Sequence, residues 1–290
     1  MITAETLTVV SCAIAPEAVE PLFELLDADL FTPTSWYDVE TQVSRLDVFL
    51  EDPAQADVVE AVLLRTAELA GLPPLRPERS TLARSDWAES WKRFFHVEKI
   101  SPHIVVRPSW ETYTAASDER VITLDPGLSF GTGKHATTQA CLRFLDQLAE
   151  ENTARSVRDM GCGSGILAIG AKLLGFQEVC GFDNDPDCIP VSNENAAINH
   201  VSIPFTVDDL SHGYPQTDIV VANILAPILI QFAPQVAGSL NRASSARLIL
   251  SGILDDQYAA VKAAYEAQGL QEVSSLLIEN WRSGLFKPGS

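Results

Sequence analysis

The 290-residue sequence lacks the patterns of several common classes of protein. Its five cysteines form no CxxC pair and its five histidines show no metal-ligand spacing, so neither a disulfide framework nor a zinc site is expected. The longest apolar run, residues 219–233, is interrupted by Asn223, Pro227 and Gln231 and is too short to span a bilayer. The first 40 residues contain no Lys or Arg, which a secretory signal would need. We therefore expect a cytoplasmic protein without a membrane segment or a bound metal.

Basic residues are scarce, because 20 Lys and Arg stand against 39 Asp and Glu, a formal net charge of −19. Most of the excess lies in residues 1–78, which contain 15 acidic residues and only three arginines. A field of this sign repels phosphate backbones and attracts basic partners. The alternative is a solvated acidic surface that keeps the protein soluble. Both interpretations argue against direct binding to nucleic acid.

Residues 1–78 predict a small α+β domain of the ferredoxin-like type. The apolar patterns give the order strand, helix, strand, strand, helix, strand, with strands at residues 7–14, 36–39 and 46–50 and helices that begin at Pro16 and Pro53. Trp87 and Trp91 lie four residues apart in a short helical pattern. We therefore expect residues 79–98 to form a linker helix.

From residue 99 to residue 290 strand-like and helical patterns alternate. Strands are expected near residues 157–160, 178–182, 219–222 and 248–250, each followed by a helical pattern, and a closing hairpin is expected around Trp281. Such alternation is typical of an α/β domain with a doubly wound, mostly parallel sheet of Rossmann-like type.

The strongest motif is the glycine string in residues 159–165, which read DMGCGSG between an expected strand and a helix. Gly161 and Gly163 allow the backbone to turn sharply and to approach a ligand without interference from a Cβ atom. Asp183 follows 22 residues after Gly161, at the end of the next strand, where a carboxylate can accept both hydroxyls of a ribose. We therefore expect a nucleoside cofactor at this turn.

Two other nucleotide motifs fit less well. The dinucleotide fingerprint G-x-G-x-x-G needs a third glycine where this chain has Ile166. A phosphate loop that ended at Gly133 and Lys134 would need glycine at Leu128 and Ser or Thr at His135. A nucleoside triphosphatase is therefore not expected, and a nicotinamide enzyme is a weaker alternative.

The short glycine string, with Asp159 two residues before it, resembles the first motif of class I S-adenosylmethionine-dependent methyltransferases. The chain further resembles one family closely, the PrmA family of bacterial methyltransferases of large-subunit ribosomal protein eleven. The resemblance rests on the strings DPGLSFGTG at residues 125–133, residues 161–169 and NILA at residues 223–226. It covers nearly the whole chain from about residue 85, whereas only the order of elements agrees before that.

The resemblance implies an N-terminal substrate-recognition domain and a C-terminal class I methyltransferase domain. It also implies S-adenosylmethionine as cofactor, and lysine side chains of a basic ribosomal protein, with its N-terminal amine as a further acceptor, as the methylated groups. The residues that match the family's cofactor-binding positions are Thr138, Gly161, Asp183 and Asn223, and Phe130 matches the loop that closes over the cofactor. Lys134 and Ala136 depart from the family pattern, which usually has Thr and Pro there.

Several roles stay open at this point. Asn223 could be an ordinary helix cap, or its side-chain oxygen could accept a hydrogen bond from the target amine; the resemblance favours this catalytic role. His135 could act as a base or cap the following helix. Asp208 and Asp209 could contact an adenine or be solvated. The alternatives for the whole protein are methylation of another protein lysine and a non-catalytic S-adenosylmethionine-binding role.

Overall fold

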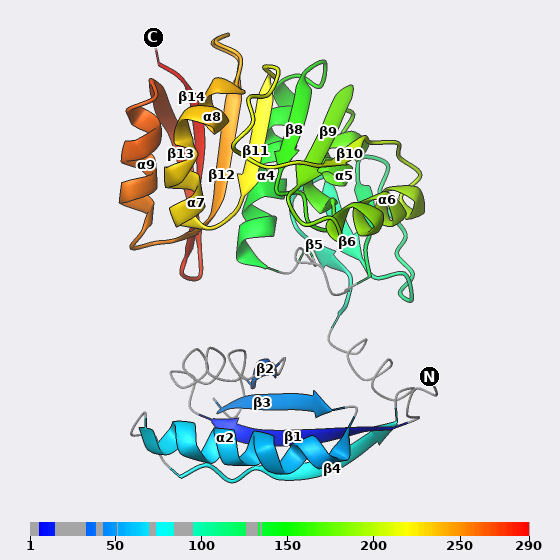
Figure 1. Ribbon diagram of the computed structural model, residues 1–290. Coiled ribbons are helices and arrows are strands. Elements are labelled where there is room, and N and C mark those ends of the chain that lie inside the picture. Colours follow the sequence, from blue (N-terminus) through cyan, green and yellow to red (C-terminus); the bar gives the residue numbers. More distant parts are fainter. Residues whose placement is uncertain are drawn as a thin grey trace. The chain divides into compact units, whose positions relative to one another are not determined.

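The computed structural model describes residues 6–14, 33–38, 43–50, 52–69, 74–83, 95–125, 133 and 135–289. The chain divides into two compact units, Met1–Phe94 and Phe95–Ser290 (Figure 1). None of the helices in these ranges combines the length and apolar composition that a membrane crossing needs.

The first unit contains a four-stranded antiparallel sheet with the strand order β2-β3-β1-β4. Its elements are β1 (Thr6–Ile14), β2 (Pro33–Asp38), β3 (Val43–Leu50), the 3-10 helix η2 (Pro53–Gln55), α2 (Ala56–Leu69) and β4 (Glu78–Ala83). Asp52 caps the helical segment, because its carboxylate accepts a hydrogen bond from the Ala54 backbone N–H at 2.9 Å. Val59 and Leu63 of α2 are buried in the same core as β1 and β3. The strand order agrees with the ferredoxin-like prediction. The helix expected at Pro16 lies outside the described residues, so that part stays a prediction.

The start of the predicted linker helix is a strand instead. Residues 78–83 form β4, which pairs with β1 at the edge of the sheet. An edge strand can be polar, and here the Arg79 guanidinium forms ion pairs with Asp57 and Glu60 of α2, each at 2.5 Å. The segment therefore has no apolar alternation by which to recognise it. Trp87 and Trp91 lie outside the described residues.

The second unit is built on a seven-stranded sheet with the order β10-β9-β8-β11-β12-β14-β13 (Figure 1). Its strands are β8 (Ser156–Met160), β9 (Glu178–Asp183), β10 (Phe205–Val207), β11 (Ile219–Asn223), β12 (Arg247–Leu254), β13 (Leu270–Ile278) and β14 (Trp281–Pro288). The first five strands in this order run parallel, and β14 pairs antiparallel with both β12 and β13. The predicted α/β sheet and its closing hairpin are confirmed.

Helices cover both faces of this sheet (Figure 1). They are α4 (Ala136–Glu151), α5 (Ile166–Leu173), α6 (Cys188–Ile198), α7 (Ala226–Gln231), α8 (Ala233–Gly238) and α9 (Tyr258–Glu266). Strand β11 supplies both cores, since Val221 packs with α4 and α5 whereas Val220 and Ala222 pack with α7 to α9. A strand buried on both faces explains the uninterrupted apolar run that ends at Asn223.

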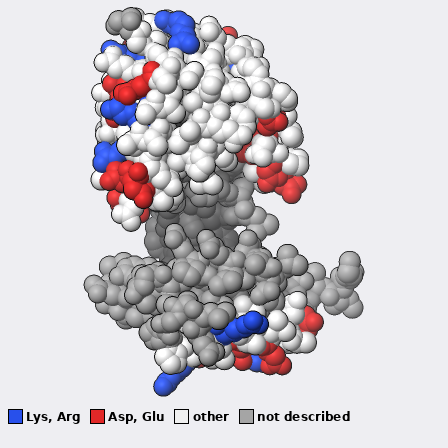
Figure 2. Space-filling model, turned by 60° about the vertical axis from the view of Figure 1, so that its left-hand side comes forward, with Lys and Arg blue, Asp and Glu red and all other residues white. Residues whose placement is uncertain are grey.

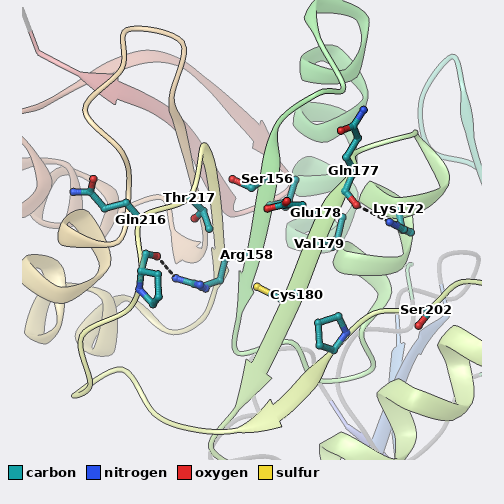
Figure 3. Close-up of a pocket in the computed structure, with 13 residues that line it drawn as sticks. Ser156, Arg158, Lys172, Gln177, Glu178, Val179, Cys180, Ser202, Gln216 and Thr217 are labelled. Carbon is teal, nitrogen blue, oxygen red and sulfur yellow. Dashed lines mark hydrogen bonds between the residues drawn. The ribbon is translucent and has the colours of Figure 1, made fainter.

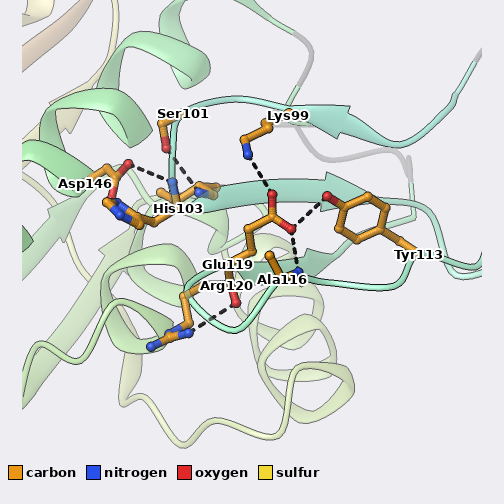
Figure 4. A network of polar contacts seen from close by, with 9 residues as sticks. Lys99, Ser101, His103, Tyr113, Ala116, Glu119, Arg120 and Asp146 are labelled. Carbon is orange, nitrogen blue, oxygen red and sulfur yellow. Dashed lines mark hydrogen bonds and ion pairs between the residues drawn. The ribbon is translucent and has the colours of Figure 1, made fainter.

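A small three-stranded sheet, with the order β5-β6-β7, precedes the main sheet in the chain. Its strands are β5 (Glu98–Lys99), β6 (Ile104–Arg107) and β7 (Arg120–Thr123). Asp146 of α4 accepts hydrogen bonds from the His103 backbone N–H at 3.2 Å and pairs with the His103 ring at 2.9 Å (Figure 4). These contacts join the small sheet to the helix that leads into the glycine-rich region.

Glu119 organises the loop before β7 (Figure 4). Its carboxylate accepts hydrogen bonds from Lys99 Nζ at 2.7 Å, the Tyr113 hydroxyl at 2.8 Å and the Ala116 backbone N–H at 2.9 Å. The hydrogen bond from the Lys99 ammonium and those from Ala116 and Tyr113 lower the pKa of Glu119 to about 2.

Acid should therefore destabilise this region through Glu119. A carboxyl group whose pKa is lower in the folded than in the unfolded chain contributes stability above the unfolded pKa, and that contribution disappears as the pH falls. We expect the unfolding free energy to decrease from about pH 5 downward, and Glu119→Gln to flatten this decrease. Urea unfolding between pH 3 and pH 6 measures it, with Asp118→Asn on the same loop as control. An unchanged pH slope in Glu119→Gln would contradict the assignment.

Candidate functional site

The glycine string forms a tight turn between β8 and α5. Gly161, Gly163 and Gly165 have backbone φ angles of 72°, 51° and 78°. These values lie in the left-handed region, which residues with a Cβ atom rarely adopt. The turn therefore needs its three glycines, and it brings the backbone N–H groups at the start of α5 to the carboxyl edge of the sheet.

The turn is held against both neighbouring strands. The N–H groups of Gly161 and Cys162 donate hydrogen bonds to the Phe182 carbonyl of β9, both at 2.9 Å. On the other side, a Cβ atom on Gly161 would lie 2.6 Å from Cγ2 of Ile224, in the loop after β11. The glycine at position 161 thus permits close contact between the turn and the loop that begins at Asn223.

Asp183 closes the turn from the end of β9. One carboxylate oxygen accepts a hydrogen bond from the Gly163 N–H at 2.8 Å, and the other accepts one from the Asp185 N–H at 3.1 Å. The residue is 8% exposed. Each carboxylate oxygen has two acceptor positions, so both retain capacity for a ribose hydroxyl. Asp183 therefore contacts the glycine turn and can still accept hydrogen bonds from a ribose.

Three side-chain oxygens at this edge of the sheet are buried and have no hydrogen-bond partner in the described part of the chain. They are Thr138 Oγ1 of α4, Asp159 Oδ1 of β8 and Asn223 Oδ1 of β11. Two more such atoms, in Gln235 and Tyr265, belong to the helices α8 and α9. An unsatisfied buried polar atom costs about 1–3 kcal/mol. A polar ligand that reached the first three would remove this cost, so the residues fit a polar cofactor.

Hydrogen bonds bring these residues from separate elements to one place. Asn223 is the register partner of Ser251 on β12. The Ser251 hydroxyl donates to the Thr137 carbonyl at 3.2 Å, which fixes the first turn of α4 over the ends of β11 and β12. Thr138 is the next residue of that turn. The start of α4, the glycine turn and the end of β11 therefore meet at the carboxyl edge of the sheet, where they form the candidate site.

His135 caps α4. Its Nδ1 atom accepts a hydrogen bond from the Thr137 N–H at 3.4 Å, and its ring packs edge-on against Trp281, with 5.0 Å between the ring centroids. Burial lowers the pKa of His135 and favours the neutral form that the cap requires. Of the two roles left open by the sequence, the structure supports the cap.

The loop that the sequence places over the cofactor is only partly described. Phe130 and Lys134 lie outside the described residues, so their predicted roles stay predictions. Gly133, between them, has a φ of 82°, and a Cβ atom there would lie 3.0 Å from Val106 and 3.2 Å from Ile166. The end of the loop thus lies against the first residue of α5.

The carboxylates of Asp208 and Asp209 form interactions within their own loop. The Asp208 carboxylate pairs with the His212 ring, which lowers the pKa of Asp208. Asp209 accepts a hydrogen bond from the Ser211 N–H at 2.7 Å. The Asp208 N–H donates to the Asp183 carbonyl at 3.0 Å, so the backbone of this loop still borders the site.

The structure adds two features of the site that the sequence does not show. Asp159 is recognisable in the sequence as part of the motif, but its complete burial is not, and burial raises its pKa to about 7. Gly252 has a φ of 80°, and a Cβ atom there would lie 2.5 Å from the Ile224 carbonyl oxygen. This glycine lets the Asn223 loop rest on β12. A glycine within an apolar strand was the available signal.

A cavity of about 480 Å³ lies at the other end of the strands (Figure 3). It is lined by the amino ends of β8 and β9, including Arg158, Glu178 and Cys180. The two cationic side chains on it are occupied by backbone carbonyls, since Arg158 donates to Pro215 at 2.5 Å and Lys172 donates to Gln177 at 2.7 Å. This cavity lies at the opposite end of β8 from the glycine turn.

The chain matches the family model described as ribosomal protein L11 methyltransferase (PrmA) over residues 13–287. Two relatives carry the same name. The one from Geobacter sulfurreducens is 36% identical over 265 residues, which cover 90% of this chain and 83% of the relative. The one from Chloroflexus aurantiacus is 33% identical and covers 94% of this chain and 95% of the relative.

A solved structure gives the same result for the fold. The crystal structure of a ribosomal protein L11 methylase from Lactobacillus delbrueckii subsp. bulgaricus superposes with a TM-score of 0.61 at 32% sequence identity. The match covers 68% of this chain and the whole of that chain.

Replacing Gly161 by alanine should disrupt the contact between the glycine turn and the loop after β11. The added Cβ collides with Ile224, and the left-handed φ strains any residue other than glycine. We expect the affinity for S-adenosylmethionine, measured by calorimetry, to fall at least about tenfold, equivalent to about 1.4 kcal/mol. Gly269→Ala is the matched control, because its φ of 79° is similar but nothing lies within 4 Å of the added atom. Equal losses in both variants would refute the contact.

Replacing Thr138 by valine removes the unpartnered hydroxyl without changing the shape of the side chain. We expect the protein without cofactor to be stabilised by about 1 kcal/mol, because a buried unsatisfied group disappears. This corresponds to a rise in Tm of about 2–4 °C. The affinity for S-adenosylmethionine should fall, because its partner is lost. A lower Tm together with unchanged affinity would show that the hydroxyl has a structural partner only.

Proposed function

This chain belongs to the ribosomal protein L11 methyltransferase family, and on that premise we propose that it methylates lysine side-chain amines of ribosomal protein L11. It is a class I methyltransferase with S-adenosylmethionine as its cofactor. When bound, the cofactor supplies an electrophilic methyl group on a sulfonium. The residues of this chain must hold that group, receive the amine and exclude competing water.

The unpartnered oxygen of Asn223 is the observation that carries the proposal. It is buried at the end of β11, in a loop that touches the glycine turn through Ile224. We propose that Gly161, Gly163, Asp183 and Thr138 bind the cofactor. We further propose that the Asn223 oxygen accepts a hydrogen bond from an N–H group of the incoming amine. This contact would aim the nitrogen lone pair at the methyl group. Positioning of this kind accounts for much of the acceleration in a displacement reaction.

The amine must be neutral to react. Deprotonating a lysine of pKa 10.4 at pH 7 costs about 4–5 kcal/mol, and uncharged surroundings lower this cost because they disfavour the ammonium form. Lys, Arg, Asp and Glu are all missing from residues 219–241. Leu225 and Ile228, next to Asn223, are exposed and apolar. Figure 2 turns the side with α7 to α9 forward and shows a broad area without charged residues on this unit.

A strong general base is not part of the proposal. His135, the candidate from the sequence, uses its Nδ1 atom to cap α4. We propose that the ammonium loses its proton to solvent as it approaches the uncharged segment of residues 219–241. Asn223 then binds the neutral amine.

The first unit is proposed to recruit the basic substrate. Residues 1–78 have a charge balance of −12, which attracts a basic ribosomal protein and increases the rate of encounter. This division of labour assigns recognition to the N-terminal domain and chemistry to the domain that begins at about residue 99.

Asn223→Ala should separate positioning from cofactor binding. We expect turnover to fall about 100-fold, because the amine is no longer oriented, while the affinity for S-adenosylmethionine changes little. Single-turnover methylation and calorimetry measure the two effects. Asn193→Ala on α6 is the control, since its exposed side chain donates to the Ile189 carbonyl of the same helix. Turnover that stays at the wild-type rate in Asn223→Ala would refute the role.

The substrate is tested with labelled S-adenosylmethionine and ribosomal proteins from cells that lack this methyltransferase. Mass spectrometry of the labelled band should identify lysines of ribosomal protein L11. Label on lysines of another protein would retain the activity and overturn the substrate. Binding of S-adenosylmethionine without labelling of any protein would indicate a non-catalytic role.

A further inference from the structure

Asp159 is a buried carboxyl group on the strand that leads into the glycine turn. It is 1% exposed and lies on β8, between β9 and β11. Its Oδ2 atom accepts one hydrogen bond, from the Ala168 N–H of α5 at 3.2 Å, and its Oδ1 atom has no partner in the described part of the chain. A buried carboxylate is normally paired with a cation or saturated by donors. In the described residues Asp159 has neither arrangement.

The groups that face Asp159 do not supply a positive charge. Asp183 of β9 adds a second negative charge. Cys162 of the turn and Cys141 of α4 are the other titratable neighbours, and burial raises the pKa of both thiols, so they stay neutral near pH 7. Strand β11 has no charged residue, and the contact from α5 is the Ala168 N–H. Two carboxyl groups thus lie at the glycine turn, and in the described residues neither forms an ion pair.

S-adenosylmethionine brings the missing positive charges. It carries an ammonium and a sulfonium group against a single carboxylate. A positive charge near a buried carboxyl group favours its ionised form. The demethylated product, S-adenosylhomocysteine, is a neutral thioether at the same sulfur and lacks one of the two cations.

We propose that Asp159 holds a proton in the ligand-free protein and releases it to solvent when S-adenosylmethionine binds, so that the preference for the cofactor over its product increases with pH. The inference concerns the cofactor alone and holds whichever protein is methylated. It makes the exchange of product for fresh cofactor sensitive to pH near neutrality.

The direction follows from linkage between proton and ligand binding. Burial raises the pKa of Asp159 to about 7 in the empty site. A ligand that lowers this value binds the ionised form more tightly, so its observed affinity falls as the pH drops below about 7. The limiting slope is tenfold per pH unit for one proton. The slope should be smaller for S-adenosylhomocysteine, whose charge favours ionisation less.

Calorimetry on the full-length protein measures the released proton. Binding of S-adenosylmethionine at pH 6.0 and pH 6.5 is compared in phosphate and in an amine buffer, whose ionisation heats differ. These pH values lie below the α-amino range of about 7.7–8.0, so the cofactor's own amine stays protonated. We expect release of more than about half a proton for S-adenosylmethionine and less for S-adenosylhomocysteine.

Asp159→Asn should abolish this release and make the affinity for S-adenosylmethionine independent of pH between 6 and 7. Asp146→Asn is the control, because Asp146 is also a buried carboxyl group, 3% exposed, but is paired with His103. It should retain the proton release. No release by the wild-type protein would overturn the proposal even if the Asp159 variant failed to fold. Equal release in Asp159→Asn, or equal pH slopes for cofactor and product, would also overturn it.

Discussion

The contact between the glycine turn and the loop after β11 is the constraint on which the site depends. A side chain at position 161 would occupy the space of Ile224, and a side chain at position 252 would displace the carbonyl of the same residue. Ile224 is therefore enclosed by two positions that accept only glycine. Because Asn223 precedes it directly, the placement of the amide oxygen is set by backbone packing. The position of the Asn223 oxygen thus depends on the absence of a Cβ atom at Gly161 and at Gly252.

Hydrogen bonds within the protein hold the residues around the glycine turn in place. Asp183 is held by the N–H groups of Gly163 and Asp185, and the start of α4 is held by Ser251. These bonds restrict the rotamers of the groups that meet a ligand, so little side-chain entropy remains to be lost on binding. At this edge of the sheet, the buried side-chain oxygens without a partner in the described residues are those of Thr138, Asp159 and Asn223. Such an arrangement combines a rigid frame with a few unused acceptors.

The sequence predicts much of this because its signals are local. Alternation of strands and helices, the glycine string and the aspartate 22 residues later are sufficient for the α/β sheet and its cofactor edge. A fourth strand was expected in the first unit, but residues 79–83 were assigned to a linker helix, because an edge strand can satisfy its polar side chains by ion pairs, as Arg79 does, without apolar alternation. The burial of Asp159 and the support from Ser251 and Gly252 could not be predicted, since they arise from strands far apart in the chain. His135 was ambiguous for the same reason, because its partner Trp281 lies 146 residues away.

The position of β14 has a consequence for how the protein is made. This strand lies between β12 and β13, and its Ser283 hydroxyl lies 2.6 Å from that of Ser251, which fixes α4. Trp281 of the same strand packs on the residue that caps α4. During translation these contacts can form only after residues 281–283 have left the exit tunnel. The start of α4 is therefore fixed only after these residues have been made.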